Sequence, residues 1–143
     1  MEFVSPYLLA IGLAWIIAHI VKYANATSKG KKLDLTHQLF ISGGMPSSHA
    51  ATTVAVWTVV LFRDGYASGL FGIATLVTLV ICYDAVKVRR SVGEQGRAIQ
   101  QIIKGAKLDV ELPRAAKGHT PLEVFAGSLL GLLIGAVVYI ATK

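Results

Sequence analysis

The sequence has few charged residues and a single cysteine for its length. Only 15% of its 143 residues are charged, whereas 54% are hydrophobic, and the mean hydropathy is +0.60. A soluble domain has about 25% charged residues, so this composition excludes a disordered chain and an ordinary cytosolic enzyme. One cysteine, Cys82, allows no intramolecular disulfide and excludes a disulfide-stapled secreted domain. We therefore expect one membrane-embedded domain over residues 1–143.

Four segments lack Asp, Glu, Lys and Arg over a length that suits a membrane span. Three of them, 3–21, 65–83 and 124–142, are close to the roughly 20 residues that cross the hydrocarbon core. The fourth, 39–62, is interrupted by Gly43, Gly44 and Pro46, so we expect its helix over 50–62 after an irregular segment. Irregular backbone at membrane depth is tolerated only where protein or a watery cavity satisfies it, which is typical of a site. The sequence predicts an all-α polytopic bundle of about four spanning helices.

The positive charges gather on one side of this arrangement. Of the 14 Lys and Arg residues, all but Arg63 and Lys143 follow the first span or lie in the segment 87–120. Because cytoplasmic loops of membrane proteins are rich in Lys and Arg, we expect both segments in the cytoplasm and both termini outside. A bacterial-type inner membrane suits this topology, and the net charge of +6 then requires no nucleic acid partner. We do not expect the first span to be a cleaved signal peptide, because the acidic Glu2 precedes it instead of cations and its apolar run is longer than a typical signal core.

Two further patterns concern helix packing. Apolar residues at helical spacing within 94–107, interspersed with cations, predict a short amphipathic cytoplasmic helix, either on the anionic membrane surface or packed on the bundle. Small residues recur every four positions in the first and last spans: Ala10, Ala14, Ala18, Gly127, Gly131 and Gly135. Such faces let helices approach closely, within one chain or across a homodimer. We favour packing within the chain and keep a homodimer as the alternative.

Two polar clusters each place a histidine at the start of a membrane helix. The first, 43–50, reads GGMPSSHA and the second, 118–123, reads GHTPLE. Helix starts present free backbone N–H groups and the positive end of the dipole, which favours an anion such as phosphate. Helix capping alone also explains Ser47, Ser48 and a Thr120–Glu123 capping box. Capping requires no histidine beside both caps, however, and ionisable groups near membrane depth are usually functional.

The second cluster also contains a histidine that a nearby carboxylate can orient. His119 and Glu123 are four residues apart, so both lie on one face of a helix. A carboxylate in this position can hold one imidazole nitrogen and leave the other free. This is the general arrangement of an oriented nucleophile or base.

Cations flank both clusters at the same interface. Lys22 ends the first span, and Asp84 ends the third, followed by Lys87, Arg89 and Arg90. An arginine grips a phosphate by two bonds, whereas a lysine acts as a point charge. We interpret Lys22, Arg89 and Arg90 as phosphate-binding residues and Lys87 as a positive anchor.

In their order along the chain, these clusters resemble the divergent branch of the type 2 phosphatidic acid phosphatase superfamily, which is related to acid phosphatase and vanadium-dependent haloperoxidase. The segment Pro46-Ser47-Ser48-His49 resembles the superfamily motif Pro-Ser-Gly-His, with Ser48 in place of glycine. The resemblance implies that His49 is the general acid that protonates the leaving oxygen.

The other superfamily motifs are matched in part. His119 and Glu123 resemble the His-x3-Asp end of Ser-Arg-x5-His-x3-Asp, with glutamate replacing aspartate. Lys22 resembles the lysine of Lys-x6-Arg-Pro, but Lys29 stands at the arginine position and no proline follows. No Ser-Arg pair lies at the standard distance before His119, and Arg114 is one residue off that spacing.

The resemblance implies metal-independent hydrolysis of a lipid phosphomonoester or diphosphate, with no cofactor. His119 is then the nucleophile that forms a phosphohistidine, and Glu123 orients it. The remaining candidate site residues bind phosphate or support the site: Lys22, Ser47, Ser48, Arg89, Arg90, Gly44, Pro46, Asp84 and Thr120. For Arg89 and Arg90 the phosphate-binding role is our own inference, since the Ser-Arg pair of the motif is missing. The expected partners are a lipid phosphate substrate and membrane lipids, and the substrate itself is not readable from the sequence.

Two other functions compete with this interpretation. A metal-dependent membrane hydrolase would use His37, His49, His119 and Glu123 as a zinc set. Against it, the sequence has no H-E-x-x-H motif, and the nearby cations would repel a metal ion. A non-catalytic lipid-phosphate binder, or a subunit of a larger complex, would keep the anion site without turnover.

Overall fold

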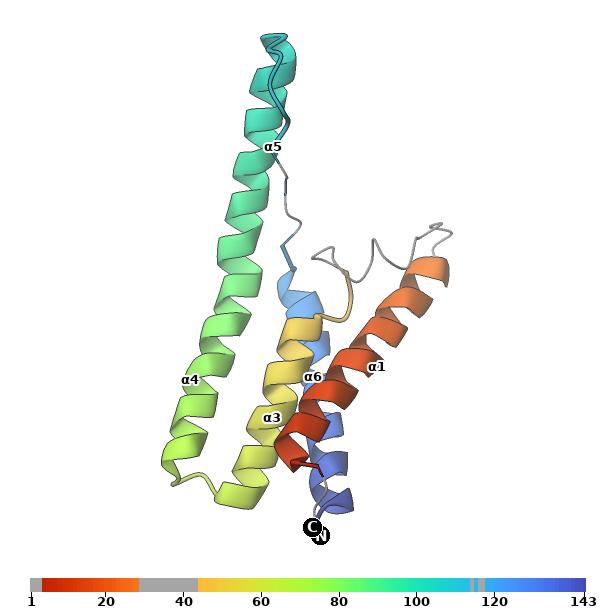
Figure 1. Ribbon diagram of the computed structural model, residues 1–143, viewed down its shortest axis with the longest axis vertical. Helices are drawn as coiled ribbons and strands as arrows, with labels where there is room; N and C mark the ends of the chain where they lie inside the picture. Colours follow the sequence, from red (N-terminus) through yellow and green to blue (C-terminus); the bar gives the residue numbers. More distant parts are fainter. Residues whose placement is uncertain (1–3, 29–43, 114, 116–117) are drawn as a thin grey trace.

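The protein is an all-helical bundle in the computed structural model, which describes residues 4–28, 44–113, 115 and 118–143. In chain order the helices are α1 (Pro6–Ser28), α3 (Ser48–Asp64), α4 (Gly69–Tyr83), the π-helical turn η1 (Asp84–Val88), α5 (Arg89–Gly105) and α6 (Pro121–Ala141) (Figure 1). No strand occurs among the described residues. The predicted all-α class is confirmed.

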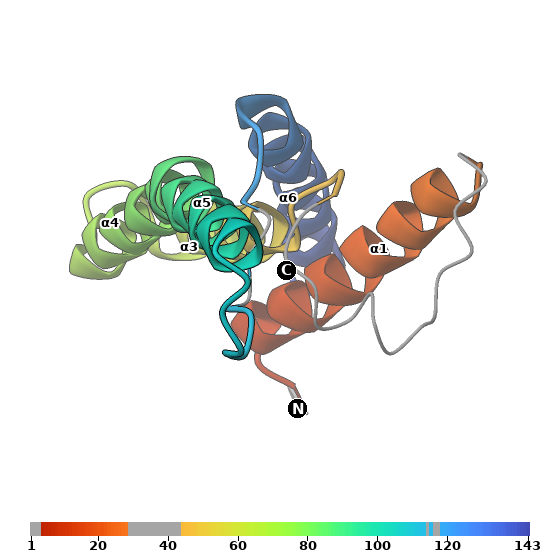
Figure 2. The same cartoon turned by 90° about the horizontal axis from the view of Figure 1, so that it is seen from above.

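The spans are arranged around a central helix. Within the described ranges, three helices are long and apolar enough to cross a membrane: α1, α6, and the continuous helix Gly69–Gly105. Helix α3 has 17 residues, about 25 Å at 1.5 Å per residue, and packs against α1, α4 and α6 (Figures 1 and 2). These helices agree with the predicted count of about four spans. The start of α1 and the end of α6 lie at the same end of the bundle (Figure 1).

The glycine face of α6 packs directly on the backbone of α3. A Cβ added at Gly131 or Gly135 would lie 2.5 Å from the carbonyl oxygen of Ala51 or Ala55, closer than real Cβ atoms approach. The alanine face of α1, Ala10, Ala14 and Ala18, is also fully buried in the same core. Both small-residue faces are therefore used within the chain, as their spacing in the sequence predicted. Homodimer formation stays a prediction.

The amphipathic helix predicted within 94–107 exists, but it is not a separate element. It forms the end of one helix that runs from Gly69 to Gly105 and projects beyond the other helices (Figure 1). No proline interrupts this stretch, and η1 keeps the backbone hydrogen bonds continuous between α4 and α5. After α5 the chain turns back along it, and Nε2 of Gln100 donates a hydrogen bond to the carbonyl oxygen of Pro113 (2.7 Å).

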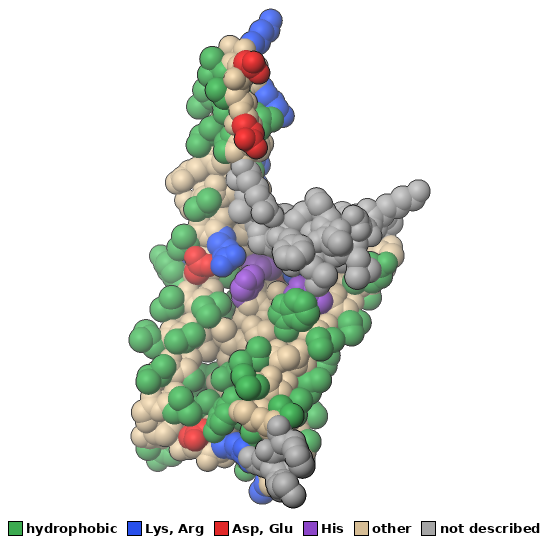
Figure 3. Space-filling model, viewed as in Figure 1, with side chains coloured by type: hydrophobic (Ala, Val, Ile, Leu, Met, Phe, Trp, Pro, Cys, Tyr) green, Lys and Arg blue, Asp and Glu red, His purple; other side chains and the backbone are tan. Residues whose placement is uncertain are grey.

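Apolar and polar side chains separate along the long axis of the bundle. Hydrophobic side chains cover the body formed by the membrane helices, whereas histidines and cations gather near the level where α3 and α6 begin (Figure 3). Helix α4 has no buried residue at all. This distribution suits a body surrounded by lipid, with a polar site at one end.

Candidate active site

His119 is held in place just before α6 by its backbone and its ring. Its backbone N–H donates a hydrogen bond to the carbonyl oxygen of Ala85 (3.0 Å), and its side chain is only 1% exposed. Nδ1 lies 3.3 Å from Oε2 of Glu123. Because a carboxylate accepts, Nδ1 carries the proton and Nε2 keeps its lone pair. That Nε2 is buried and makes no hydrogen bond to any described residue.

The π-helical turn η1 provides the backbone contacts that fix this histidine. Such turns shift the backbone hydrogen bonding of a helix by one residue and are frequent at functional sites. Here the carbonyl of Ala85, the buried residue of the turn, accepts from His119. The preceding Gly118 packs on the backbone of Arg90, where an added Cβ would lie 2.5 Å from the Arg90 nitrogen. Glycine at position 118 is therefore required for the loop to pass this close to the helix.

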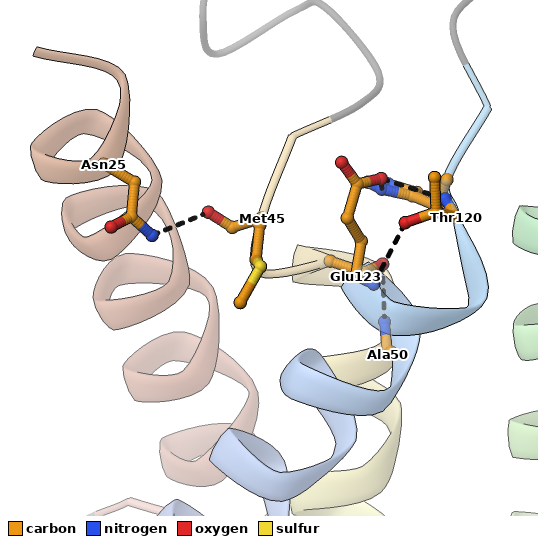
Figure 4. A network of polar contacts seen from close by, with 7 residues as sticks. Asn25, Met45, Ala50, Thr120 and Glu123 are labelled. Carbon is orange, nitrogen blue, oxygen red and sulfur yellow. Dashed lines mark hydrogen bonds and ion pairs between the residues drawn. The ribbon is translucent and has the colours of Figure 1, made fainter. Parts of the chain in front are cut away.

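Glu123 caps α6 and orients His119 at the same time. Its Oε2 accepts from the backbone N–H of Thr120 (3.0 Å), and its own N–H donates to Oγ1 of Thr120 (3.3 Å) (Figure 4). These two bonds form the capping box, with Pro121 as the first helical residue. The same Oε2 contacts Nδ1 of His119. Capping and histidine orientation, which the sequence presents as alternatives, are thus satisfied by one carboxylate.

His49 lies in the first turn of α3 and faces His119. The centroids of the two rings are 6.2 Å apart, and the ring planes are inclined at 65°. Nδ1 of His49 is also buried and without a hydrogen bond in the described part of the chain. Two histidines separated by 70 positions in the sequence are therefore neighbours in the structure, and each has a buried ring nitrogen without a hydrogen bond to any described residue.

The start of α3 is tied to the start of α6. Ser47 is the fully buried N-cap of α3, and its Oγ accepts from the backbone N–H of Ala50 (3.4 Å). Its own N–H donates to the carbonyl oxygen of Glu123 (2.9 Å). Ser48 is the first residue of α3 and is 7% exposed, and the preceding Pro46 is buried as well. The positive ends of two helix dipoles therefore meet at this point.

Lys22 contributes the positive charge of α1. Its side chain is only 7% exposed and lies beneath Gly44, where an added Cβ would be 3.5 Å from the Lys22 Cγ. Gly44 has a φ of +89°, a left-handed conformation that favours glycine. One turn further on, Nδ2 of Asn25 donates to the carbonyl oxygen of Met45 (3.2 Å) (Figure 4). The charge of Lys22 is near enough to act on both histidines and on Glu123.

The structure separates the two adjacent arginines. Nε of Arg89 pairs with Oδ2 of Asp84 at 2.6 Å, and the charge of Arg89 acts on both histidines. The Arg90 side chain instead pairs with Glu94 (3.1 Å) and is exposed. Lys87 is exposed too. Arg89 is therefore placed at the site, whereas the Arg90 side chain lies on the exposed face of α5. Two other cations of the sequence motifs, Arg114 and Lys29, lie outside the described residues.

Burial governs the protonation state of His119. Removal from water lowers the pKa of its imidazole, and the nearby charges of Lys22 and Arg89 lower it further. The Glu123 carboxylate acts in the opposite direction, and the pKa stays below the ordinary value of 6.5. The ring is consequently neutral at pH 7, as a nucleophile must be.

Three members of the alternative zinc set, His49, His119 and Glu123, lie at this site. Among the described residues, no group of three or more His, Cys, Asp or Glu side chains is placed to hold one metal ion. His37, a member of the alternative zinc set, lies outside those residues.

The sequence did not predict the contributions of Ala85 and Asn25 to the site. Ala85 acts through its backbone carbonyl, which any residue has, so no sequence signal marks it.

The fold and site define a polytopic membrane protein with two facing histidines, the partly buried His49 and the buried His119, at the starts of two helices. The profile of the Divergent PAP2 family matches residues 3–134, and the chain belongs to this family. It is also 33% identical over 153 residues to the uncharacterized membrane protein YuiD of Bacillus subtilis (strain 168), covering 96% of each chain. No solved structure gives a significant match.

Proposed function

We propose that this membrane protein is a phosphatase that hydrolyses a lipid phosphomonoester or diphosphate through a phosphohistidine intermediate. The observation that carries the proposal is the convergence of His49 and His119. Their rings are 6.2 Å apart, and each has a buried nitrogen that bonds to no described residue. This spacing suits one tetrahedral phosphate between a nucleophile on one side and a proton donor on the other.

The proposed reaction has two displacements. Nε2 of His119 attacks phosphorus, the P–O bond to the lipid breaks, and protonated His49 gives its proton to the leaving oxygen. Glu123 holds Nδ1–H and stabilises the positive charge that develops on the imidazole. Water then attacks the phosphohistidine, the P–N bond breaks, and His49 takes the proton. Phosphate leaves, and His119 is neutral again.

The surrounding charges suit phosphoryl transfer, in which the protein mainly positions the group and neutralises its charge. Lys22 and Arg89 supply positive charge, and the ion pair of Arg89 uses Nε rather than its terminal nitrogens. The N-termini of α3 and α6 add backbone dipoles at the same place. Asp84 holds Arg89, and Ser47, Ser48 and Thr120 shape the two helix starts.

The site is proposed to face the cytoplasm of a bacterial-type inner membrane. Supporting this orientation, the histidines lie at the end of the bundle where the basic segment 87–113 emerges, opposite the start of α1 (Figures 1 and 3). Substrates made on the inner leaflet then reach the site directly. Phosphatidic acid, phosphatidylglycerol phosphate and polyprenyl phosphates or diphosphates present the same head group chemistry.

A substrate panel tests the proposal. The purified protein in detergent is expected to release phosphate from at least one of these lipids, with the same rate in the presence of EDTA. Loss of release with EDTA would instead identify a metal-dependent hydrolase. Binding of lipid phosphate without release from any of them would identify a non-catalytic binder, the alternative favoured by Ser48 in place of the motif glycine.

Arg89 and Arg90 are expected to differ in catalysis. Arg89→Gln removes a cation that acts on both histidines, so kcat/KM should fall on the order of 100-fold. Arg90→Gln removes only an exposed pair with Glu94 and should cost less than about threefold. Steady-state kinetics on the best substrate of the panel measures both values. The matched control Arg97→Gln lies further along exposed α5, and a larger loss for Arg90→Gln than for Arg89→Gln would contradict the assignment.

A further inference from the structure

Helix α5 exposes a regular apolar stripe beyond the membrane body. Its members, defined here as the α5 seam, succeed one another in steps of four, three, four and three residues: Val88, the last residue of η1, and Val92, Gln95, Ile99 and Ile102 on α5. The four apolar members are 46–66% exposed, which is unusual for large apolar side chains outside a lipid-covered region. A spacing that averages 3.5 residues is the pattern of a helix that pairs with another helix.

The polar residues of α5 follow the same seven-residue repeat. Cations recur at Arg90, Arg97 and Lys104, on the helix face opposite the α5 seam. Gly93 and Gly96 are buried, and described residues that follow α5 contact the helix at two points, Pro113 at Gln100 and Gly118 at the backbone of Arg90. Described residues therefore cover part of α5, the side chains of the three cations are exposed, and the apolar members of the α5 seam are exposed in the described part of the chain.

Lipid is poorly placed to cover the α5 seam. Helix α5 continues the line of α4 and, with 17 residues, extends about 25 Å past the level of the histidines (Figures 1 and 3). Its apolar residues stand away from the hydrophobic body instead of lying along its surface. The long helix Gly69–Gly105 is also peripheral, because α4 packs mainly on α3. A second helix therefore has room to approach it.

We propose that the α5 seam pairs with the α5 seam of a second copy of this chain, forming a parallel two-helix homodimer. Two copies with the same membrane topology can meet only in parallel about an axis normal to the membrane. Each apolar residue then packs near its counterpart, and Gln95 pairs with Gln95 of the partner subunit, a polar contact that fixes register. The cations at seven-residue spacing face outward, so two chains of net charge +6 do not bring these charges together.

Disulfide cross-linking in native membranes tests this dimer. The background is Cys82→Ser, which removes the single cysteine, and one cysteine is then introduced at a time. Ile99→Cys and Ile102→Cys lie in the α5 seam, whereas Arg97→Cys is the matched control on the opposite face of the same helix. After mild oxidation, the seam variants should give at least about fivefold more covalent dimer than the control. Equal yields at all positions would overturn the proposal.

Two further measurements separate the alternatives. Ile99→Glu should convert the detergent-solubilised dimer to monomer, and Arg97→Glu should leave it dimeric. Because Ile99 is exposed on the single chain, its substitution should not lower the melting temperature of the monomer. A fluorophore attached at position 99 reports contact with lipid through quenching by brominated lipids. Quenching there, together with no covalent dimer of the seam cysteine variants, would show that α5 lies on the bilayer and would also overturn the proposal. Phosphatase activity need not be present for any of these readouts.

Discussion

His119→Ala is expected to lower phosphate release by about 10,000-fold or more, because it removes the proposed nucleophile. Among the described residues, only His49 has another buried ring nitrogen without a hydrogen bond, and its proposed role is proton donation. Initial rates on the best lipid phosphate of the panel measure the loss. Rapid acid-free quenching with labelled substrate should also trap a phosphohistidine in the starting protein and none in the variant.

His19→Ala is the matched control for this substitution. His19 lies on α1 beside Trp15, and its Nδ1 is 2.8 Å from the Trp15 carbonyl oxygen. It is a membrane-helix histidine outside the site, so its removal should change the rate by less than about twofold. A His119→Ala variant that keeps more than about a tenth of the starting rate would refute the phosphohistidine mechanism. The same variant should still bind lipid phosphate, since Lys22 and Arg89 remain.

The sequence predicted those site features that depend on spacing within one helix. The interval between His119 and Glu123 and the Thr-x-x-Glu capping signature place these groups together locally, and the structure joins them through Oε2. The four-residue repeat of small residues in α6 likewise predicted close helix packing, because it requires only helical periodicity.

Site features that depend on how the helices pack against one another could not be predicted from the sequence. Arg89 and Arg90 are neighbours in sequence, and the way the helix packs in the bundle decides which of the two acts on the histidines and which pairs with Glu94. The Ala85 carbonyl carries no side-chain signal. The continuity of α4 with α5 also escaped prediction, since a change from apolar to charged composition at Asp84 resembles a helix end but leaves the backbone hydrogen bonds unbroken.

Gly127→Ala is expected to reduce both stability and activity. An added Cβ would collide with the carbonyl oxygen of Ser47, the N-cap that precedes His49, so the start of α3 must move away from α6. Overpacking of this kind costs about 2 kcal/mol, which lowers the melting temperature by roughly 5 °C. Because the displacement falls at the site, kcat/KM should drop at least about tenfold beyond any loss of folded protein. Thermal unfolding in detergent and phosphate release measure the two effects.

Gly135→Ala and Gly72→Ala separate packing from catalysis. Gly135 makes the same close approach to α3 two turns further from the histidines, so its substitution should lower stability to a similar extent but spare kcat/KM. A Cβ at Gly72 meets nothing within 4 Å, and alanine there should raise stability by about 0.5–1 kcal/mol through its helix propensity. Equal activity loss for Gly127→Ala and Gly135→Ala would mean that general loosening of the bundle, and not separation of the two helix starts, controls turnover. The loss of kcat/KM should therefore increase from Gly72→Ala through Gly135→Ala to Gly127→Ala. This order tests whether the α3–α6 contact holds the two imidazoles at one phosphate.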